Sequence, residues 1–358
     1  MILCLLFFCL LGESMALDNT TGATGNSISS KSIMCYYKGN MMDSSTELIS
    51  LDPKEIPCEC EIIIYSRFSI NQLSVIDVDK TFLKLVTDLN KPVIVTLSRE
   101  GFYTDWGIIL GPDGNAKDAK VLCDFAKENK IAGYLLEGLT PECLYRPFND
   151  KIAQYIIPYI KQLSECSCPG FIIGVAVDAH GSSIKNPCMY NFAAMNDFVT
   201  FYEIKTYLLN GCDPSIYNGI TPITKFDHGA KYLYGMEEVA SILKESKICL
   251  TKIVYDIEMY PVDPASETFT SYSQVCKGEF NCSSWCIQTT NNFFDKGKFA
   301  LEQDSGIIVK FVDLDDIKNE CACSSSFIGF KNIIAGFRGG SQITCAKYDV
   351  QSTPNSIK

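Results

Sequence analysis

The sequence predicts an α/β fold, a (β/α)8 TIM barrel with a cysteine-rich insertion between strands 7 and 8. Eight short segments rich in apolar and β-branched residues recur along the chain of 358 residues, and helical patterns separate most of them. No glycine-rich phosphate loop follows the first segment, which disfavours the alternative of an open doubly wound sheet.

The eight predicted strands are near-continuous apolar runs, as strands buried on both faces of a sheet are. They span residues 33–37, 62–68, 92–97, 131–137, 171–177, 201–207, 248–255 and 333–337. In the predicted helices, apolar residues recur three and four positions apart and form one stripe. These helices span residues 81–89, 116–129, 152–163 and 236–244.

The interval between the last two predicted strands is long and rich in cysteine. It contains Cys276, Cys282, Cys286, Cys321 and Cys323. We therefore expect a disulfide-stapled insertion in this interval, together with the seventh helix of the barrel.

The amino terminus has the pattern of a secretory signal peptide. Residues 1–16 are apolar and end in Ser14, Met15 and Ala16, a small-x-small cleavage pattern. The run is shorter than the ~18 apolar residues that span a membrane, so an uncleaved anchor is the second interpretation. The predicted division of the chain is a signal peptide at 1–16, a flexible leader at 17–31, the barrel at 32–350 and a tail at 351–358.

The cysteine content agrees with a secreted, extracellular protein. Cys4 and Cys9 leave with the signal peptide, and an even number of the 18 cysteines remains, as an oxidised framework requires. The Cys-x-Cys pairs have one intervening residue, whereas zinc sites have two to four. We expect no metal and no cofactor. The asparagines of two sequons, Asn19 and Asn281, are predicted to carry glycans.

A formal net charge of −11 argues against nucleic acid and anionic membranes as partners. The segment 131–141, IAGYLLEGLTP, is the most informative part of the chain. It is predicted to be a buried strand that runs into a loop, and its alternation places Leu135, Glu137 and Leu139 on one face. One carboxylate between two leucines on a strand face suggests either a functional acid or the remainder of an acidic row.

Four segments together resemble the family-18 glycoside hydrolases, the chitinases and their inactive relatives. The resemblance covers roughly residues 32–345. Cys35-Tyr36-Tyr37 resembles the first strand of the family, and CEIIIYSRF from Cys60 resembles the second. Segment 131–141 falls at the Asp-Gly-x-Asp-x-Asp-Trp-Glu signature, and segment 197–211 falls at the sixth strand. In this family the cysteines of the first two strands are bonded, which implies a Cys35–Cys60 disulfide.

The same resemblance implies that the catalytic residues are lost. Family members use the final glutamate of the signature as the acid, and Leu139 occupies that position. A leucine has no proton to donate, and general acid catalysis contributes about 10²–10⁴ in rate. Ala132 and Leu135 replace the first two aspartates, while Glu137 replaces the third. In the sixth strand Leu208 replaces an aspartate, and Lys205 replaces the methionine.

The predicted ligand-binding residues are those that remain polar or aromatic at the barrel mouth. They are Tyr36, Glu137, Lys205 and Tyr207. Because a buried carboxylate needs a partner, we predict an ion pair between Glu137 and Lys205. Further aromatic faces are expected from Tyr103, Trp106 and Phe337. The predicted eighth strand carries no tryptophan, the residue that forms the sugar-stacking floor in the family.

The sequence therefore predicts a chitinase-like pseudoenzyme that binds chitin or another N-acetylglucosamine-containing glycan without hydrolysing it. The first alternative is an extracellular scaffold that binds a protein and no sugar. The second is an active glycoside hydrolase with relocated carboxylates, because Asp178, His180, Asp256 and Glu258 follow predicted strands at the end where barrel enzymes keep their chemistry. Solvated loop carboxylates are the simpler interpretation of these acids.

Overall fold

The computed structural model describes residues 31–39, 51–140, 149, 151–165, 170–265, 269–278 and 284–350. The predicted signal peptide, most of the predicted leader, the predicted tail and both sequon asparagines, Asn19 and Asn281, lie outside these residues.

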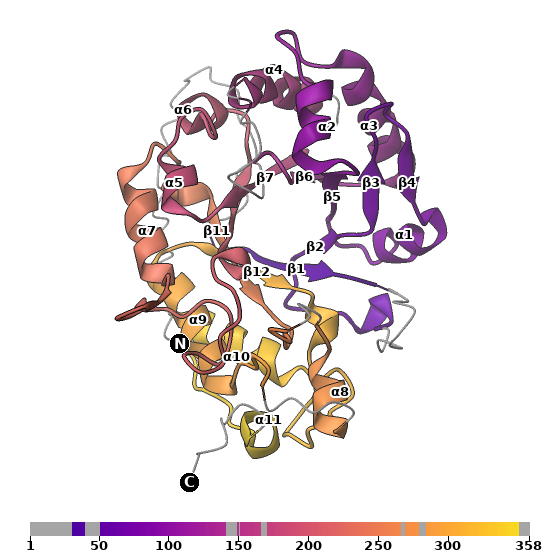
Figure 1. Ribbon diagram of the computed structural model, residues 1–358. Coiled ribbons are helices and arrows are strands. Elements are labelled where there is room, and N and C mark those ends of the chain that lie inside the picture. Colours follow the sequence, from indigo (N-terminus) through magenta and orange to yellow (C-terminus); the bar gives the residue numbers. More distant parts are fainter. Residues whose placement is uncertain are drawn as a thin grey trace, which may run out of the picture.

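Eight parallel strands of the described chain close into a barrel with helices around it (Figure 1). The ring runs β2–β1–β12–β11–β8–β7–β6–β5, and pairing of β5 with β2 closes it. The strands are β1 (Ile33–Tyr37), β2 (Ile62–Tyr65), β5 (Val93–Arg99), β6 (Gly133–Leu136), β7 (Ile172–Asp178), β8 (Phe201–Lys205), β11 (Ile253–Glu258) and β12 (Gly306–Lys310). The predicted TIM barrel is confirmed.

Two antiparallel hairpins are added to the barrel. Strands β3 (Phe68–Ile70) and β4 (Ile76–Val78) continue the sheet beyond β5, and β9 (Phe226–His228) pairs with β10 (Lys231–Leu233). Along the chain, the hairpin β9–β10 lies between β8 and helix α7 (Met236–Glu245).

The predicted eighth strand is wrong. Residues 333–337 lie in helix α10 (Ile328–Phe337), and the eighth strand is β12, which the sequence pattern did not identify. A short apolar run with β-branched residues does not distinguish a buried strand from a buried helix. Tertiary packing decides here, because α10 packs on α9 (Thr290–Glu302). A Cβ atom on Gly336 would lie 2.0 Å from the carbonyl oxygen of Phe294 in α9, so the backbones of the two helices meet at this glycine.

Helices connect the strands on the outside of the barrel. Those with at least eight residues are α1 (Lys80–Thr87), α2 (Phe102–Ile109), α3 (Ala116–Asn129), α4 (Ile152–Glu165), α7 (Met236–Glu245), α9 (Thr290–Glu302) and α10. The four predicted helices are confirmed in α1, α3, α4 and α7. Capping residues fix where they begin: the Asp79 side chain accepts from the Phe82 amide, and the Asn115 side chain accepts from the Asp118 amide. The shorter helices are α5 (Gly181–Ile184), α6 (Phe192–Met195), α8 (Tyr272–Lys277) and α11 (Ala346–Val350).

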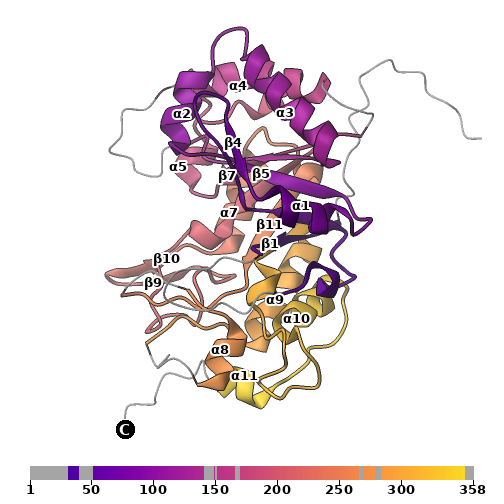
Figure 2. The same cartoon turned by 90° about the vertical axis from the view of Figure 1, so that its right-hand side faces the viewer.

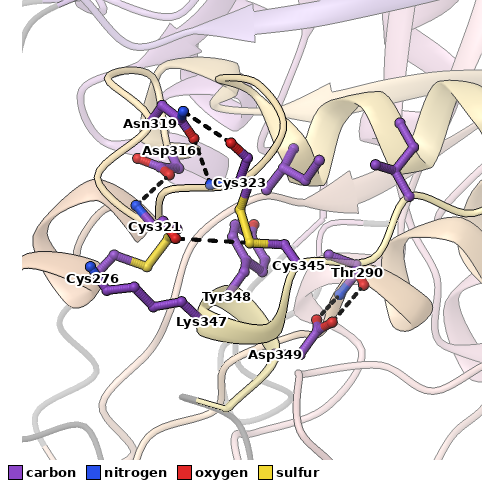
Figure 3. The surroundings of a disulfide bond; sticks show 12 residues. Cys276, Thr290, Asp316, Asn319, Cys321, Cys323, Cys345, Lys347, Tyr348 and Asp349 are labelled. Carbon is purple, nitrogen blue, oxygen red and sulfur yellow. Dashed lines mark hydrogen bonds between the residues drawn. A yellow bond between two sulfur atoms is a disulfide. The ribbon is translucent and has the colours of Figure 1, made fainter.

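Disulfides staple the lobe formed by the C-terminal part of the chain. The Cys276–Cys321 and Cys323–Cys345 bonds join α8 and the segment before α11 to the loop that follows β12 (Figure 3). Cys212–Cys286 joins the loop after β8 to the excursion between β11 and β12. The insertion between strands 7 and 8 therefore exists, but it is shorter than predicted, because Cys321 and Cys323 follow the eighth strand.

The disulfide implied by the resemblance, Cys35–Cys60, is confirmed. It joins β1 to Cys60, which lies two residues before the start of β2. The expected oxidised framework does not include three described cysteines, since Cys58, Cys188 and Cys249 are free thiols. Among the described helices, none combines the length and the apolar character that crossing a membrane requires.

Candidate functional site

The interior of the barrel changes from apolar to charged along the strands. In the amino-terminal and central parts of the strands the inward side chains form a separate apolar cluster that includes Met34, Ile64, Leu135, Phe201 and Ile308. The inward residues at the carboxyl-terminal ends are polar or charged, among them Tyr36, Glu137, Glu203, Asp256 and Lys310. The chemistry of this barrel is therefore gathered at the end where TIM barrels place their sites.

A buried lysine is the centre of this charged layer. The Lys310 ammonium lies 3.3 Å from Glu203 Oε1 and 3.7 Å from Glu137 Oε1. It also lies 3.6 Å from the centroid of the Tyr36 ring and 4.5 Å from that of Tyr207. The lysine at the end of β12 thus joins β1, β6 and β8 through two carboxylates and two aromatic faces.

Tyr36 contacts the same two carboxylates through its hydroxyl group. Its hydroxyl lies 2.8 Å from Glu137 Oε1 and 3.0 Å from Glu203 Oε2. A phenol carries one hydrogen, so it donates to one carboxylate at a time. Burial, together with the nearby Glu137, raises the pKa of Glu203. Burial opposes the charge of Lys310, but Glu203 and the other surrounding acids outweigh it and hold the pKa of Lys310 well above its usual range.

Asp256 lies beneath the mouth on β11. One of its oxygens accepts from the Thr206 hydroxyl at 2.8 Å and from the Tyr207 amide at 3.1 Å, while the other has no hydrogen-bond partner among the described residues. Burial, followed by the charge of Glu203, raises its pKa from 3.8 to about 8. Asp256 is therefore largely protonated at neutral pH, and it anchors the backbone at Tyr207.

A pocket of about 480 Å³ opens above this layer. Its lining comes from the ends of β5, β6, β7 and β8 and from the loops that follow them. The lining residues are Ser98, Phe102, Glu137, Gly138, Thr140, Ala176, Asp178, His180, Tyr190, Lys205 and Tyr207. Three of the four predicted ligand-binding residues, Glu137, Lys205 and Tyr207, thus line one cavity, and the fourth, Tyr36, lies directly below it, bonded to Glu137.

The predicted ion pair between Glu137 and Lys205 is wrong. Among the ion pairs of the described residues, the partner of Glu137 is Lys310, and Lys205 makes none. The Lys205 ammonium lies 5.7 Å from the centroid of the Tyr207 ring instead. Burial opposes its charge, but Tyr207 and Glu137 outweigh burial and raise the pKa of Lys205.

Leu139 does not share a face with Leu135. Gly138 has a φ of +72°, a conformation that breaks the strand alternation. Leu139 packs in the outer core between sheet and helices, while Leu135 packs inside the barrel. Ala132 precedes β6 and packs against the inner cluster. Leu208 lies in a short 3-10 helix, Thr206–Leu208, directly after β8.

The aromatic residues expected at the mouth have different roles. Trp106 is fully buried, and its ring nitrogen donates to the Glu137 carbonyl at 2.7 Å, so it positions the backbone of that acid. Tyr103 is also buried, and Phe337 lies in α10. Phe102, which sequence reasoning missed, is half-exposed and lines the pocket. The true eighth strand carries no tryptophan either; it ends in Lys310.

The acids considered for a relocated centre separate into two groups. Asp178 and His180 line the pocket, and the Asp178 carboxylate accepts from the His180 amide at 3.1 Å and from the Ser183 hydroxyl at 2.8 Å. Asp256 and Glu258 are not solvated loop residues, as the simpler interpretation held, because both are buried within β11. Glu258 Oε1 lies 2.7 Å from the buried Lys296 ammonium.

One group of potential metal ligands occurs among the described residues. A carboxylate oxygen of Asp316 and the sulfur atoms of Cys321 and Cys323 lie within 4.8 Å of one another. Both sulfur atoms are in disulfides (Figure 3). They therefore cannot act as thiolate ligands, the form in which cysteine binds metals.

Comparison with known proteins agrees with this architecture. No family model matches the chain. A curated relative, "Probable chitinase 10" of Drosophila melanogaster, is 22% identical over an alignment 257 residues long, which covers 64% of this chain and 11% of the relative. The chain therefore spans about a tenth of the length of that relative.

Solved structures match over most of the chain. Catalytic domain 2 of the Group II chitinase of Ostrinia furnacalis, as a mutant in complex with (NAG)5, matches with a TM-score of 0.72 and 18% identity over 89% of this chain and 100% of that domain. The Group IV chitinase of the same species, in complex with allosamidin, matches with a TM-score of 0.70 and 16% identity over 87% of this chain and 100% of that chain. Human YKL-39 is described as a pseudo-chitinase with retained chitooligosaccharide binding properties. It matches with a TM-score of 0.60 and 14% identity over 90% of this chain and 99% of that chain. This chain thus has the chitinase-like barrel fold of the family-18 glycoside hydrolases.

Proposed function

We propose that this protein binds N-acetylglucosamine-containing oligosaccharides in the pocket at the barrel mouth and does not hydrolyse them. The observation that carries the proposal is the Glu137–Lys310 pair beneath an open pocket of about 480 Å³. The pocket has room for a small ligand, while the acid at its base is held in a charge pair.

The lining of the pocket suits a sugar. A pyranose has apolar ring faces and a rim of hydroxyl groups, so it binds where aromatic side chains lie beside hydrogen-bonding groups. Phe102 and Tyr207 supply the aromatic surface. Lys205 supplies a donor with no ion-pair partner among the described residues, and Glu137 supplies an acceptor.

The contacts of the pocket carboxylates support the proposed absence of hydrolysis. A general acid must hold a proton that it can donate to the leaving oxygen. Glu137 accepts from Tyr36 and pairs with Lys310, and Asp178 accepts two hydrogen bonds, so the contacts of both engage them as acceptors. Asp256 has a raised pKa, but it lies fully buried beneath Tyr207. The similar fold of YKL-39, a pseudo-chitinase that retains chitooligosaccharide binding, supports the same combination.

Retention on chitin beads, with N-acetylglucosamine oligomers as competitors, tests the binding. We expect retention that the oligomers abolish and that Tyr207→Ala weakens, while Tyr155→Ala, a half-buried tyrosine on α4 away from the pocket, leaves it unchanged. Retention lost equally in both variants, or absent from the wild type, would contradict the proposal and favour a scaffold that binds a protein.

Incubation with chitin oligomers tests the second half of the proposal. We expect no product above a heat-killed control, judged by chromatography of the oligomers. Release of product would show that an acid of the pocket donates a proton; Asp178→Asn and Glu137→Gln would then identify which one does.

We further infer that the chain is exported and that its signal peptide is removed after Ala16. The apolar start of the sequence and the disulfides support this inference. Terminal sequencing of the protein from a culture medium is expected to begin at Leu17. Recovery of the intact amino terminus in the membrane fraction would indicate an anchor instead.

A further inference from the structure

We propose a second sugar-binding subsite on the hairpin β9–β10, formed by Tyr232 and Tyr234 and continuous with the pocket at the barrel mouth. This inference rests on the proposed function and extends it. An oligosaccharide that fills the pocket would continue over this hairpin, so the protein would bind long chains more tightly than short ones.

The hairpin presents the two tyrosines on one face. Its register pairs Lys231 with His228, Tyr232 with Asp227 and Leu233 with Phe226. Since side chains alternate along a strand, Tyr232 and Tyr234 share one face and Leu233 points to the other. Leu233 is 6% exposed, whereas Tyr232 is 40% and Tyr234 is 42% exposed. Two large aromatic side chains are thus directed to solvent beside a buried leucine.

Both tyrosines are held in place. The Tyr234 amide donates to Asn210 Oδ1 at 2.8 Å, and Asn210 Nδ2 donates to the Tyr234 carbonyl at 2.9 Å. The Tyr232 hydroxyl donates to Glu238 Oε1 at 2.6 Å. The two rings meet edge to face with centroids 4.8 Å apart. Rings fixed in this way lose little conformational entropy when a ligand stacks on them.

The tyrosine face is continuous with the pocket through His180. The His180 ring lines the pocket and meets the Tyr234 ring edge to face, with centroids 5.3 Å apart. In Figure 2 the hairpin lies on the same side of the molecule as α2 and α5, the helices that follow β5 and β7. Because His180 borders the pocket and also contacts Tyr234, a chain of sugars that leaves the pocket meets Tyr234 first and Tyr232 next.

The edge of the tyrosine face supplies polar groups. The Lys225 ammonium lies 5.7 Å from the centroid of the Tyr232 ring and 3.4 Å from Asp227 Oδ2. Lys225 and Asp227 provide a donor and an acceptor next to the aromatic surface, a combination that suits the apolar face and hydroxyl rim of a pyranose. Continuity with the pocket favours a further unit of the same glycan over an unrelated protein partner.

Calorimetric titration with two chitin oligomers, the dimer and the hexamer of N-acetylglucosamine, tests the inference. We expect the wild type to bind the hexamer more tightly than the dimer. Tyr234→Ala is expected to weaken hexamer binding about fivefold to tenfold, as lost aromatic stacking does, and to leave dimer binding unchanged. Tyr234→Phe, which keeps the ring, should bind like the wild type. His228→Ala, exposed on the other face of the hairpin, is the matched control.

The outcomes separate the two proposals. If neither oligomer binds, the proposed function fails and the subsite fails with it. If both oligomers bind and Tyr234→Ala changes neither affinity, or weakens both equally, the pocket stands and the subsite is overturned. A loss of hexamer affinity in His228→Ala as large as that in Tyr234→Ala would also overturn it, because the tyrosine face would then not be the cause.

Discussion

Two buried clusters in this barrel differ in how their charges are balanced. Outside the sheet, Arg99 on β5 pairs with Asp118 on α3 at 2.6 Å, and both side chains are fully buried. The Arg99 guanidinium also stacks on Trp106, 4.3 Å from the ring centroid. One cation therefore meets one anion, and the apolar core closes around them.

Inside the barrel the balance is unequal. Among the described residues, Lys310 is the ion-pair partner of both Glu137 and Glu203, while Lys205 acts on these carboxylates only from a longer distance. Glu137 also borders the pocket. Since burial penalises incompletely paired charge, two carboxylates that share one paired cation favour a proton or an external partner. The comparison indicates that the first cluster supports the fold. The second cluster instead holds two carboxylates that share one paired cation, and one of them, Glu137, can be reached by a ligand in the pocket.

The largest expected effect is at the balanced cluster. Asp118→Ala leaves Arg99 buried without its anion, which should lower the free energy of unfolding by about 3–5 kcal/mol. Urea unfolding at pH 7 measures it. Asp88→Ala, which removes an exposed i,i+4 pair with Lys84, is the control and should leave stability unchanged. Equal effects would show that the burial of the Arg99 pair contributes nothing.

Removing the lysine tests the unbalanced cluster. Lys310→Met leaves two buried carboxylates facing each other, and we expect a loss of about 3 kcal/mol at pH 7.5. The loss should shrink towards pH 4.5, because protonation of one carboxylate relieves the repulsion. Lys205→Met, which breaks no ion pair among the described residues, should change stability little. A loss in Lys310→Met that is independent of pH would contradict this account of the cluster.

The barrel could be predicted from the sequence because seven of its strands are apolar runs with helical patterns between most of them. The eighth could not, since β12 and α10 are both short apolar segments within one long interval. Close packing of α10 on α9 at Gly336 decides between them. A linear pattern carries no information about this contact.

The site was predictable where the resemblance to the family's signature and sixth strand marked the positions. Glu137, Lys205 and Tyr207 were identified in this way, and they line one pocket. Lys310 was missed with its strand, and Glu203 was missed although it lies two residues before Lys205, on the same strand face. The prediction that Leu139 shares a face with Leu135 is wrong because strand alternation was extended through Gly138, whose positive φ ends it.

The contributions of Asp256 and Asp118 to the free energy of unfolding depend on pH in opposite directions. Its pKa is about 8 in the fold against 3.8 ordinarily, so the folded protein holds this proton more tightly. The resulting stability is fully present below pH 4 and is lost as the pH rises to about 8. Asp118 has the opposite sign, because Arg99 outweighs burial and lowers its pKa; its contribution is lost in acid.

Replacing Asp256 should therefore change the free energy of unfolding most at alkaline pH. Asp256→Asn keeps the oxygen that accepts from Thr206 and the Tyr207 amide and cannot ionise. We expect its stability relative to the wild type to rise with pH and to be about 1–2 kcal/mol or more higher at pH 8.5 than at pH 5. Urea unfolding at both pH values measures this; a difference that stays constant between them would remove Asp256 as a titrating group.

The smallest expected effect is at the contact between the two clusters, where Trp106 stacks on Arg99 and donates to the Glu137 carbonyl. Trp106→Phe keeps an aromatic ring and removes the donor, which should cost about 1 kcal/mol of stability and weaken oligosaccharide binding by loosening Glu137. Tyr134→Phe removes a buried hydrogen bond to the Leu122 carbonyl, at 2.7 Å, away from the pocket. It should lose similar stability and no affinity. If both variants bind alike, Trp106 supports the balanced cluster alone and the two clusters act independently.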